Sequence, residues 1–238
     1  MKFATDLHIH SALSPCADKD MTPNNIVNMA RLKALDIIAV TDHNSAENIE
    51  AVLSCCEGSD VLTIPGMEIE TREEVHLICL FPDLESVLAM QKKVYDALPG
   101  FKNNEKIFGE QIIFNSSDEI TGSVDQLLLT ATRLSLEETV LNVLELGGAV
   151  IPAHIDRNSY SILSNLGGIP ENLNIRWLEV SRGGDREKLL KEVDYLSKYF
   201  LLTSSDAHSL ENILERENFI ELSNKTVESL LCTLRNGY

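Results

Sequence analysis

The residues of this chain best suited to chemistry are its six histidines, which lie in short segments typical of the ends of β-strands. They are His8 and His10 in Thr-Asp-Leu-His-Ile-His, His43 in Thr-Asp-His-Asn, His76 in Glu-Val-His-Leu, His154 in Pro-Ala-His-Ile-Asp, and His208 in Ser-Ser-Asp-Ala-His. None lies on an expected helix face or at a polar loop tip. Imidazole is a common metal ligand, so this distribution predicts one metal centre assembled from the whole length of the chain.

Two pairs of residues have the spacing of ligands on a strand. Side chains two positions apart face the same side, so His8 and His10 are expected to point toward one ion. Asp206 and His208 repeat that geometry with one oxygen and one nitrogen donor. Asp6, two residues before His8, is expected to accept a hydrogen bond from a ring nitrogen, and Asp42 is expected to orient an imidazole in the same way.

The carboxylate of Glu68 follows Ile64-Pro-Gly-Met at a strand end. A carboxylate can bridge two cations, which an imidazole cannot do, so a centre with several ions needs at least one such residue. Glu70 is an alternative for that role. His154, at a strand end, is a ready ligand, whereas His76 lies inside an apolar strand, where a buried histidine is more often a packed core residue.

Short apolar runs that would position these residues recur along the chain. They are Phe3 to Leu7, Ile37 to Thr41, Val61 to Ile64, Val75 to Phe81, Ala149 to Ala153, Arg176 to Val180, and Tyr199 to Thr203. Their length and β-branched content predict buried parallel strands. Capped helical stretches are expected between them, near 23–34, 46–57, 84–98, 124–133, 135–146, 186–198 and 224–235.

Alternating strands and helices predict an α/β fold with a mostly parallel sheet. Ligands drawn from so many strand ends favour a closed barrel, whose βα loops converge on one rim. We therefore expect a seven-stranded βα barrel forming a single domain over residues 1–238. The segment 99–123 interrupts this pattern and is expected to be a rim insertion with a small hairpin at 111–122, either a lid or a passive surface loop.

The composition limits the classes of partner. A formal net charge of −17 argues against long nucleic acids, whose non-specific binding needs clustered Lys and Arg. A phosphorylated substrate would need local cations at the site, which several divalent ions would supply. No apolar run approaches the length of a membrane span, and no signal peptide is evident. The five cysteines form no CxxC pair, which favours a cytoplasmic protein with free thiols. The oligomeric state stays open.

Taken in order, these motifs resemble the PHP family (polymerase and histidinol phosphatase). The matching segments are His8-x-His10, Thr41-Asp-His-Asn44, Gly66-Met-Glu68, His76, His154 and Ser205-Asp-Ala-His208. The resemblance implies a distorted seven-stranded TIM-like barrel with two or three divalent metals, usually zinc, manganese or iron. It assigns one metal to His8, His10, Glu68 and Asp206, a second to Glu68, His76 and His154, and a third to His43, His208 and a residue from the loop after the first strand.

That last residue is the point where this sequence departs from the family pattern. Many relatives have histidine or aspartate there, but this chain reads Ser14-Pro-Cys-Ala-Asp18. Cys16 is our candidate, because a thiolate is a good ligand for zinc or iron. A structural cysteine is the competing interpretation, and Asp18 and Asp20 are alternative donors.

Clustered cations with nitrogen and oxygen ligands suit phosphate ester hydrolysis, because they generate hydroxide at neutral pH and neutralise the transition state. We therefore predict a metal-dependent phosphoesterase in which hydroxide formed on the metals attacks a phosphate monoester of a small metabolite or nucleotide. Asp206, His208 and Arg182 are the predicted catalytic residues, and Arg157 is an alternative cation. Alternatives are a 5′–3′ exonuclease on short oligonucleotides, a non-catalytic metal-binding regulatory module and, more weakly, an amidohydrolase.

Overall fold

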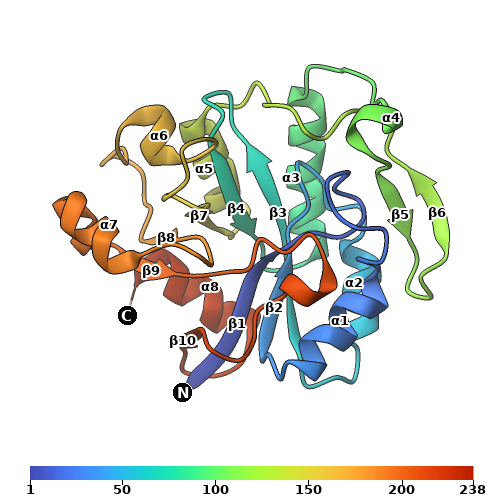
Figure 1. Cartoon of the computed structure of the whole chain (residues 1–238), viewed down its shortest axis with the longest axis horizontal. Coiled ribbons are helices and arrows are strands. Elements are labelled where there is room, and N and C mark those ends of the chain that lie inside the picture. The colour runs from blue at the N-terminus through green and yellow to red at the C-terminus, as the bar shows by residue number, and fades with distance from the viewer. Residues whose placement is uncertain (238) are drawn as a thin grey trace.

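The computed structural model describes residues 1–237 and is organised around one curled, six-stranded sheet (Figure 1). The strands run in the order β10 (Phe219–Glu221), β1 (Lys2–Ile9), β2 (Ile37–Val40), β3 (Leu62–Glu70), β4 (His76–Leu80) and β7 (Ala149–Pro152). Two further sheets have two strands each, β5 (Ile112–Phe114) with β6 (Ile120–Ser123), and β8 (Trp177–Glu179) with β9 (Phe200–Leu202).

The helices lie between the strands. They are α1 (Pro23–Leu32), α2 (Ile49–Cys56), α3 (Leu84–Ala97), α4 (Glu105–Phe108), α5 (Leu136–Glu145), α6 (Ile162–Leu166), α7 (Arg186–Glu192) and α8 (Val227–Asn236), with 3₁₀ turns at Asp194–Lys198 and Leu210–Asn212. The helix expected near 135–146 begins with a capping box formed by Ser135 and Glu138. The helix expected near 124–133 is wrong, because the amide of Asn44 binds the carbonyls of Leu128 and Thr130 and holds this segment in an irregular path.

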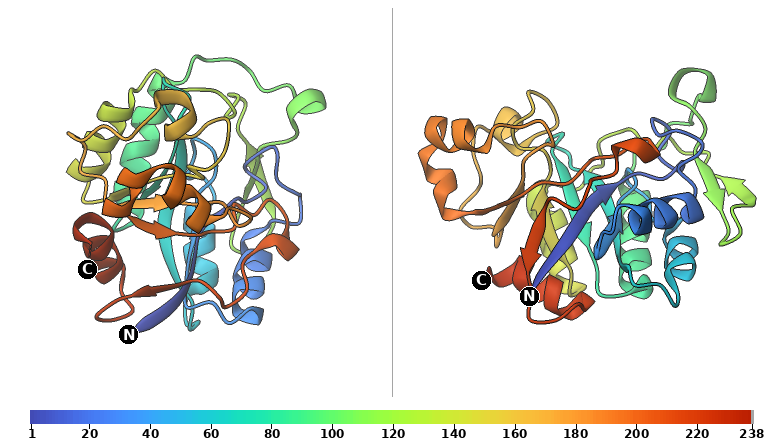
Figure 2. Two further views of the ribbon diagram at one scale, coloured as in Figure 1. Left: turned by 60° about the vertical axis from the view of Figure 1, so that its left-hand side comes forward. Right: turned by 60° about the horizontal axis from the view of Figure 1, so that its bottom comes forward.

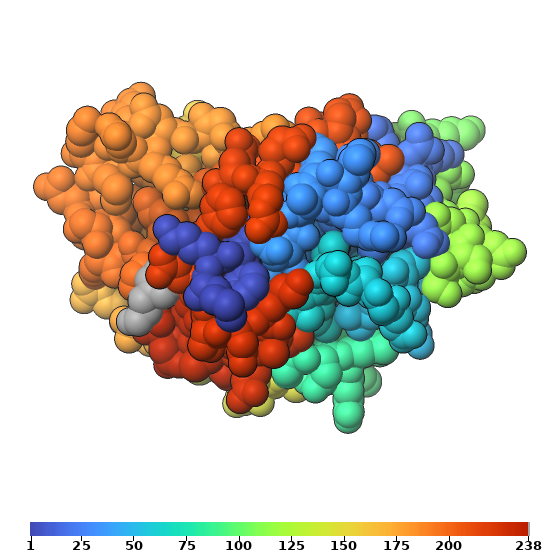
Figure 3. Space-filling model, turned by 90° about the horizontal axis from the view of Figure 1, so that it is seen from below, coloured from blue at the N-terminus to red at the C-terminus, as the bar shows by residue number. Residues whose placement is uncertain are grey.

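The expected closed seven-stranded barrel is also wrong. Each expected apolar run overlaps a strand, but β10 pairs antiparallel with the start of β1, where Lys2 lies opposite Glu221. β10 thereby occupies the hydrogen-bonding edge of β1 with which β9 would have to pair to close the barrel. Beyond the end of β9, the chain meets β1 only at an isolated bridge between Ile9 and Ala207. Figure 3 shows the start of β1, in dark blue, flanked by red C-terminal segments. The sheet is therefore a curled half-barrel.

The direction of β4 also departs from the expected parallel arrangement. β3 and β4 are antiparallel, with Glu70 opposite His76, and β4 is antiparallel to β7 as well. Residues 71–75 are too short for the crossover of about a dozen residues that parallel neighbours require. As a result, the first residue of β4 lies at the same edge of the sheet as the last residues of β3.

Both faces of the sheet are buried, and the strands alternate between them. In β2, Ile38 and Val40 belong to the larger core cluster, with residues of α1, α2, α3 and α5, whereas Ile37 and Ala39 belong to the smaller cluster with residues of α8. Two-sided burial explains why these strands read as continuous apolar runs in the sequence. Within residues 1–237, no helix is long and apolar enough to cross a membrane.

The segment 99–123 contains α4 and the expected hairpin, β5–β6. The hairpin is held against the body by a hydrogen bond from the Ile112 amide to the Ala12 carbonyl and by the side chain of Asn48, which binds Ile112 and Phe114. Figure 2 shows α4 standing away from the body in both views. The insertion therefore adjoins the loop that follows β1.

Candidate metal centre

All six histidines lie at one end of the sheet, within or just beyond the last residues of the parallel strands or, for His76, at the first residue of the antiparallel β4. Two isolated bridges align their elements. The bridge between His43 and Glu68 joins the segment after β2 to β3, and the bridge between Ile9 and Ala207 brings the end of β1 beside residues 206–208. His76 reaches this end because β4 runs antiparallel, so the strand begins where its neighbours end.

The buried carboxylate of Glu68 is the centre of this cluster. Its oxygens lie 2.8 Å from His76 Nδ1 and His43 Nδ1, 3.3 Å from His8 Nε2 and His154 Nε2, and 3.6 Å from His10 Nε2. The structure therefore brings a single carboxylate into reach of five imidazoles. His76, which the sequence left between ligand and core residue, is among them.

Asp206 supplies the second carboxylate. Its Oδ1 lies 3.1 Å from His10 Nε2, 3.3 Å from His8 Nε2 and 3.7 Å from His208 Nδ1. Its Oδ2 forms an ion pair with Nη2 of Arg157 at 2.7 Å. Asp206 therefore joins the histidines of β1 to a partly exposed guanidinium.

The hydrogen bonds of His8 and His10 test whether this cluster suits a cation. Nδ1 of His8 lies 3.1 Å from Glu179 and so carries the proton that the carboxylate accepts. Ser14 Oγ donates to Asp42 and therefore accepts from Nδ1 of His10. The two Nε2 atoms then face each other at 3.1 Å with lone pairs. A proton or a metal cation must lie between them.

The oxygen atoms of the site support the same conclusion. Oε2 of Glu68 is fully buried and accepts no well-aligned hydrogen bond from the described residues, although Nδ1 of His43 lies 2.8 Å away. A buried carboxylate oxygen needs an aligned donor or a cation. Two ligands about 2.1 Å from one tetrahedral ion lie about 3.4 Å apart, which matches the separations of 3.3, 3.3 and 3.6 Å between Glu68 and His8, His154 and His10. The residues present therefore fit divalent metal ions.

The electrostatics of the cluster are strongly coupled. Burial opposes ionisation of Glu68, but the charges of His76, His8 and His43 hold its pKa well below the usual value. Burial also disfavours a charge on His8, yet Glu179, Asp206 and Glu68 raise its pKa well above 6.5. Without metals, the site therefore holds protons on some imidazoles, and metal ions must displace them.

Cys16 lies beside His43 and His208. Burial disfavours its thiolate, but hydrogen bonds with His208 and His43 more than offset this and lower its pKa to about 6. The structure thus brings together Cys16, His43 and His208, the set expected at the third position. Asp18 and Asp20 are exposed, and no contact of their carboxylates with the cluster is found in residues 1–237.

Several residues around the centre have strained backbones. Asn44, His154, Tyr160 and Asp206 all have φ between +31° and +55° without being glycine. Such residues cost on the order of 1–3 kcal/mol each and persist where the surrounding structure holds them. Their concentration here marks this edge as the functional region of the fold.

Glu179 is the residue of this site that the sequence prediction missed. It accepts hydrogen bonds from His8 Nδ1 and from the His154 amide, which orients both histidines. Asp6 was expected to orient His8 but instead accepts from the amides of Ser205 and Leu214. The available signal was a carboxylate inside an apolar strand, in the run Trp-Leu-Glu-Val.

The two candidate arginines have different surroundings. Arg182 donates to the carbonyl of Asn212, and its predicted catalytic role stays a prediction. Arg157 lines a hollow of about 110 Å³ over the metal centre. The other residues of this hollow are His43, Glu68, His76, His154, Tyr160, Asp206 and His208.

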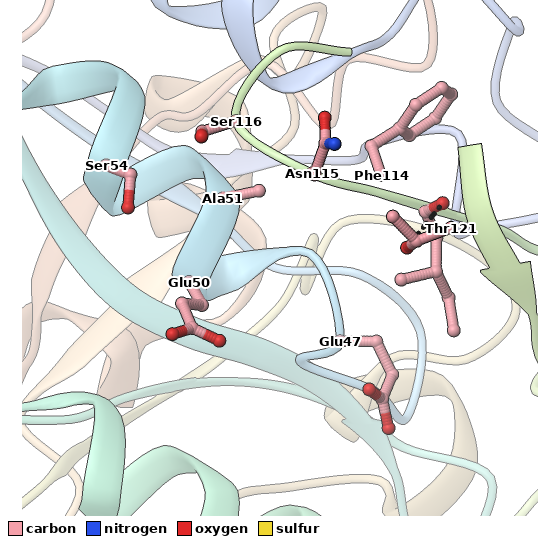
Figure 4. A pocket seen from close by; sticks show the side chains of 9 residues that line it. Glu47, Glu50, Ala51, Ser54, Phe114, Asn115, Ser116 and Thr121 are labelled. Carbon is pink, nitrogen blue, oxygen red and sulfur yellow. Dashed lines mark hydrogen bonds between the residues drawn. The ribbon is translucent and has the colours of Figure 1, made fainter. Parts of the chain in front are cut away.

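A larger hollow of about 390 Å³ lies between α2 and the β5–β6 hairpin (Figure 4). Its walls carry the carboxylates of Glu47 and Glu50 and the polar side chains of Ser54 and Asn115. It shares no residue with the hollow over the metal centre. Two carboxylates would repel a phosphate, so the chemistry of the fold belongs to the smaller hollow.

Solved structures with the same fold include nucleases. A lesion-specific endonuclease, Endonuclease Q from Pyrococcus furiosus, covers 100% of this chain with a TM-score of 0.75 and 23% identity. An Endonuclease Q complex with a 27-mer duplex that has an abasic lesion at the active site matches with a TM-score of 0.71 and 21% identity. This chain spans 57% of the length of each.

These structures correct the expectation of a small phosphorylated substrate and no long nucleic acid. That expectation rested on net charge, which describes the whole surface and not the site. A protein that contains this fold binds a duplex with an abasic lesion at its active site, so the fold does not exclude a nucleic-acid substrate.

Two further matches bear on the family. A predicted metal-dependent phosphoesterase from Bifidobacterium adolescentis covers 96% of this chain and 95% of its own, with 19% identity and a TM-score of 0.63. The uncharacterised protein MJ0043 of Methanocaldococcus jannaschii is 35% identical over 82 residues, which are 34% of this chain and 10% of that protein. The sequence model of the PHP domain matches residues 6–149. The chain therefore belongs to the PHP domain family of metal-dependent phosphoesterases.

Proposed function

We propose that this chain hydrolyses phosphodiester bonds within nucleic-acid strands. The observation that carries this proposal is the shape of the hollow over the metal centre. At about 110 Å³ it is far smaller than the ~300–1,000 Å³ of sites that enclose a ligand. Its lining residues Arg157 and Tyr160 are 45% (side chain) and 47% exposed. Such a site admits a phosphate group and leaves the rest of the substrate on the surface, as a polymer requires.

We assign two or three divalent ions, zinc, manganese or iron, to this centre. The proposed ligands are His8, His10, Cys16, His43, Glu68, His76, His154, Asp206 and His208. Bound there, the ions would lower the pKa of water and neutralise charge on the phosphate. The convergence of their nitrogen and oxygen atoms supports this assignment, and three overlapping groups of them lie within ligand distance of one another.

The protein's own groups would orient the phosphate. Arg157 is held by Asp206 with part of its guanidinium exposed, so it can bind a phosphate oxygen while remaining paired. His208 donates Nδ1–H to the carbonyl of Asp206. This leaves its Nε2 available as a ligand of the third ion. Without that ion, burial is outweighed by Cys16 and Asp206, which raise the pKa of His208, so the ring can carry a second proton on Nε2 and donate it to the leaving oxygen.

The inserted segment supports a nucleic-acid substrate. Phe101 and Phe108 are 62% and 38% exposed around α4, and Lys102 and Lys106 lie between them. Aromatic and basic side chains together suit contact with bases and phosphates. Gly109, at the end of α4, packs directly against Pro15, the neighbour of Cys16. The segment therefore stands next to the metal centre.

The test is cleavage of labelled oligonucleotides by the metal-loaded chain. The panel comprises single strands, an intact duplex, a duplex with one abasic nucleotide, and a circular single strand without ends. We expect internal cuts, opening of the circle, and loss of cleavage in His154→Ala. Shortening from the 5′ end with an intact circle would indicate an exonuclease instead. Full metal loading without cleavage of any phosphodiester would contradict the proposal and favour a non-catalytic module.

We also propose a cytoplasmic location. The five cysteines are free, without a disulfide among the residues described, which suits a reducing compartment. Labelling of the native protein in cell extract with a thiol reagent would test this, and an oxidised pair would contradict it.

A further inference from the structure

Tyr160 places an exposed aromatic ring at the mouth of the hollow over the metal centre. Its ring centroid lies 4.9 Å from that of His76, with 33° between the planes, and the residue is 47% exposed. In residues 1–237 its hydroxyl has no hydrogen-bond partner. The ring therefore partly covers a proposed ligand and presents its remaining surface to solvent.

The backbone holds this ring in place at a conformational cost. Tyr160 has φ of +55°, a region that bulky residues rarely adopt. Its carbonyl accepts a 3.0 Å hydrogen bond from the His76 amide, which ties the loop to the first residue of β4. Glycine or asparagine would occupy this conformation with less strain. A large ring fixed in such a position is suited to contact with a ligand.

Arg157, three residues earlier in the same loop, lines the same hollow. Its guanidinium is paired with Asp206 and lies beside the centre that would bind the scissile phosphate. The hollow has no room for a base in addition to a phosphate. A base attached to that phosphate would therefore lie outside the hollow, where the ring of Tyr160 is exposed.

We infer that Tyr160 stacks on an unpaired base next to the scissile phosphate, while Arg157 binds the phosphate itself. The inference rests on the proposed function and adds a substrate class to it. The substrate would be a nucleotide that is single-stranded or turned out of a duplex, because a base inside a duplex has both faces covered by its neighbours. Tyr160 acts here as a specificity residue.

The experiment compares a dinucleoside monophosphate with the matched ester in which both bases are replaced by hydrogen. The variants are Tyr160→Asn, which tolerates the positive φ, and Tyr160→Phe, with Tyr195→Asn as an exposed control outside the site. We expect Tyr160→Asn to raise KM for the base-bearing substrate about 5- to 150-fold, as loss of one stacked base predicts. The baseless ester should lose far less than the base-bearing substrate in Tyr160→Asn, and Tyr160→Phe should resemble the original chain.

A binding measurement keeps the two proposals separable. A dinucleotide with 2-aminopurine should lose fluorescence on binding to the original chain and to Tyr160→Phe, but not to Tyr160→Asn. Quenching that depends on Tyr160, without cleavage of either ester, would overturn the proposed function alone. Equal effects of Tyr160→Asn on both esters, or quenching that survives this variant, would overturn the stacking role. Failure of the original chain to quench the probe would overturn it as well.

Discussion

Nδ1 of His8 lies 3.1 Å from Oε2 of Glu179, although the two residues are 171 positions apart in the chain. Both groups are almost completely buried. The hydrogen bond sets which ring nitrogen of His8 carries the proton and directs Nε2 toward Glu68 and Asp206. Glu179, the last residue of β8, thereby orients the imidazole of His8, a proposed metal ligand on β1.

Replacement of Glu179 should therefore weaken metal binding without removing a ligand. Glu179→Gln keeps the shape but loses the charge that strengthens the His8 hydrogen bond. We expect a 10- to 100-fold loss of metal affinity, the usual effect of losing such a partner. Competition with a chromophoric chelator measures it. Glu171→Gln, at an exposed ion pair with Lys198, is the matched control and should have no effect. Unchanged affinity in Glu179→Gln would refute the orienting role.

The thiol of Cys16 allows the third metal position to be tested separately. Its pKa of about 6 makes it a thiolate at neutral pH, next to His43 and His208. Cys16→Ser should remove one equivalent of metal and leave the others bound, as measured by elemental analysis of the purified protein. Cys232→Ser changes an exposed thiol outside the centre and serves as the control. Equal metal content in both variants would show that Cys16 is not a ligand.

Metal retention should depend on pH in a defined direction. His8 and His43 have pKa values raised well above 6.5 in the metal-free fold, since nearby carboxylates outweigh burial. These protonated imidazoles stabilise the metal-free protein below about pH 6.5, and that stability is lost as the pH rises through the folded pKa values. Metals compete with the same protons, so metal affinity should increase with pH.

The measurement is the difference in Tm between metal-loaded and chelator-treated protein from pH 6 to pH 9. We expect this difference to widen as the pH rises, because the metal-free form loses stability while the loaded form gains affinity. The matched comparison is the Glu68→Gln variant, which lacks a carboxylate that contributes to raising both pKa values, most strongly that of His43. A difference that stays constant across the range would contradict the proposed competition.

The contact between α4 and the loop after β1 can be tested at Gly109. This residue has φ of +99°, and a Cβ would collide with the carbonyl of Pro15. Gly109→Ala should lower the free energy of unfolding by about 1–3 kcal/mol more than Gly100→Ala, the cost of an overpacked contact. Gly100 has a similar φ of +81° but open space around it. Urea unfolding measures the difference, and equal losses would show that the contact does not stabilise the fold.

The sequence by itself determined the donor atoms and the segments that carry them. The histidines at strand ends, the carboxylate of Glu68 after the apolar run that ends at Ile64, and the hairpin in 111–122 are local patterns, since the periodicity of side chains and the chemistry of ligands depend on neighbours along the chain. The PHP resemblance followed from the order of those motifs.

Only the tertiary structure decided which strands pair with one another and which side chains meet at the metal centre. The antiparallel direction of β4 brought His76 to Glu68, and β10 took the edge of β1 that a closed barrel would need. Glu179 gained its role from His8 rather than from its own neighbours in sequence. These outcomes depend on hydrogen bonds and packing between segments far apart in the chain, and no local pattern encodes which distant partner will satisfy them.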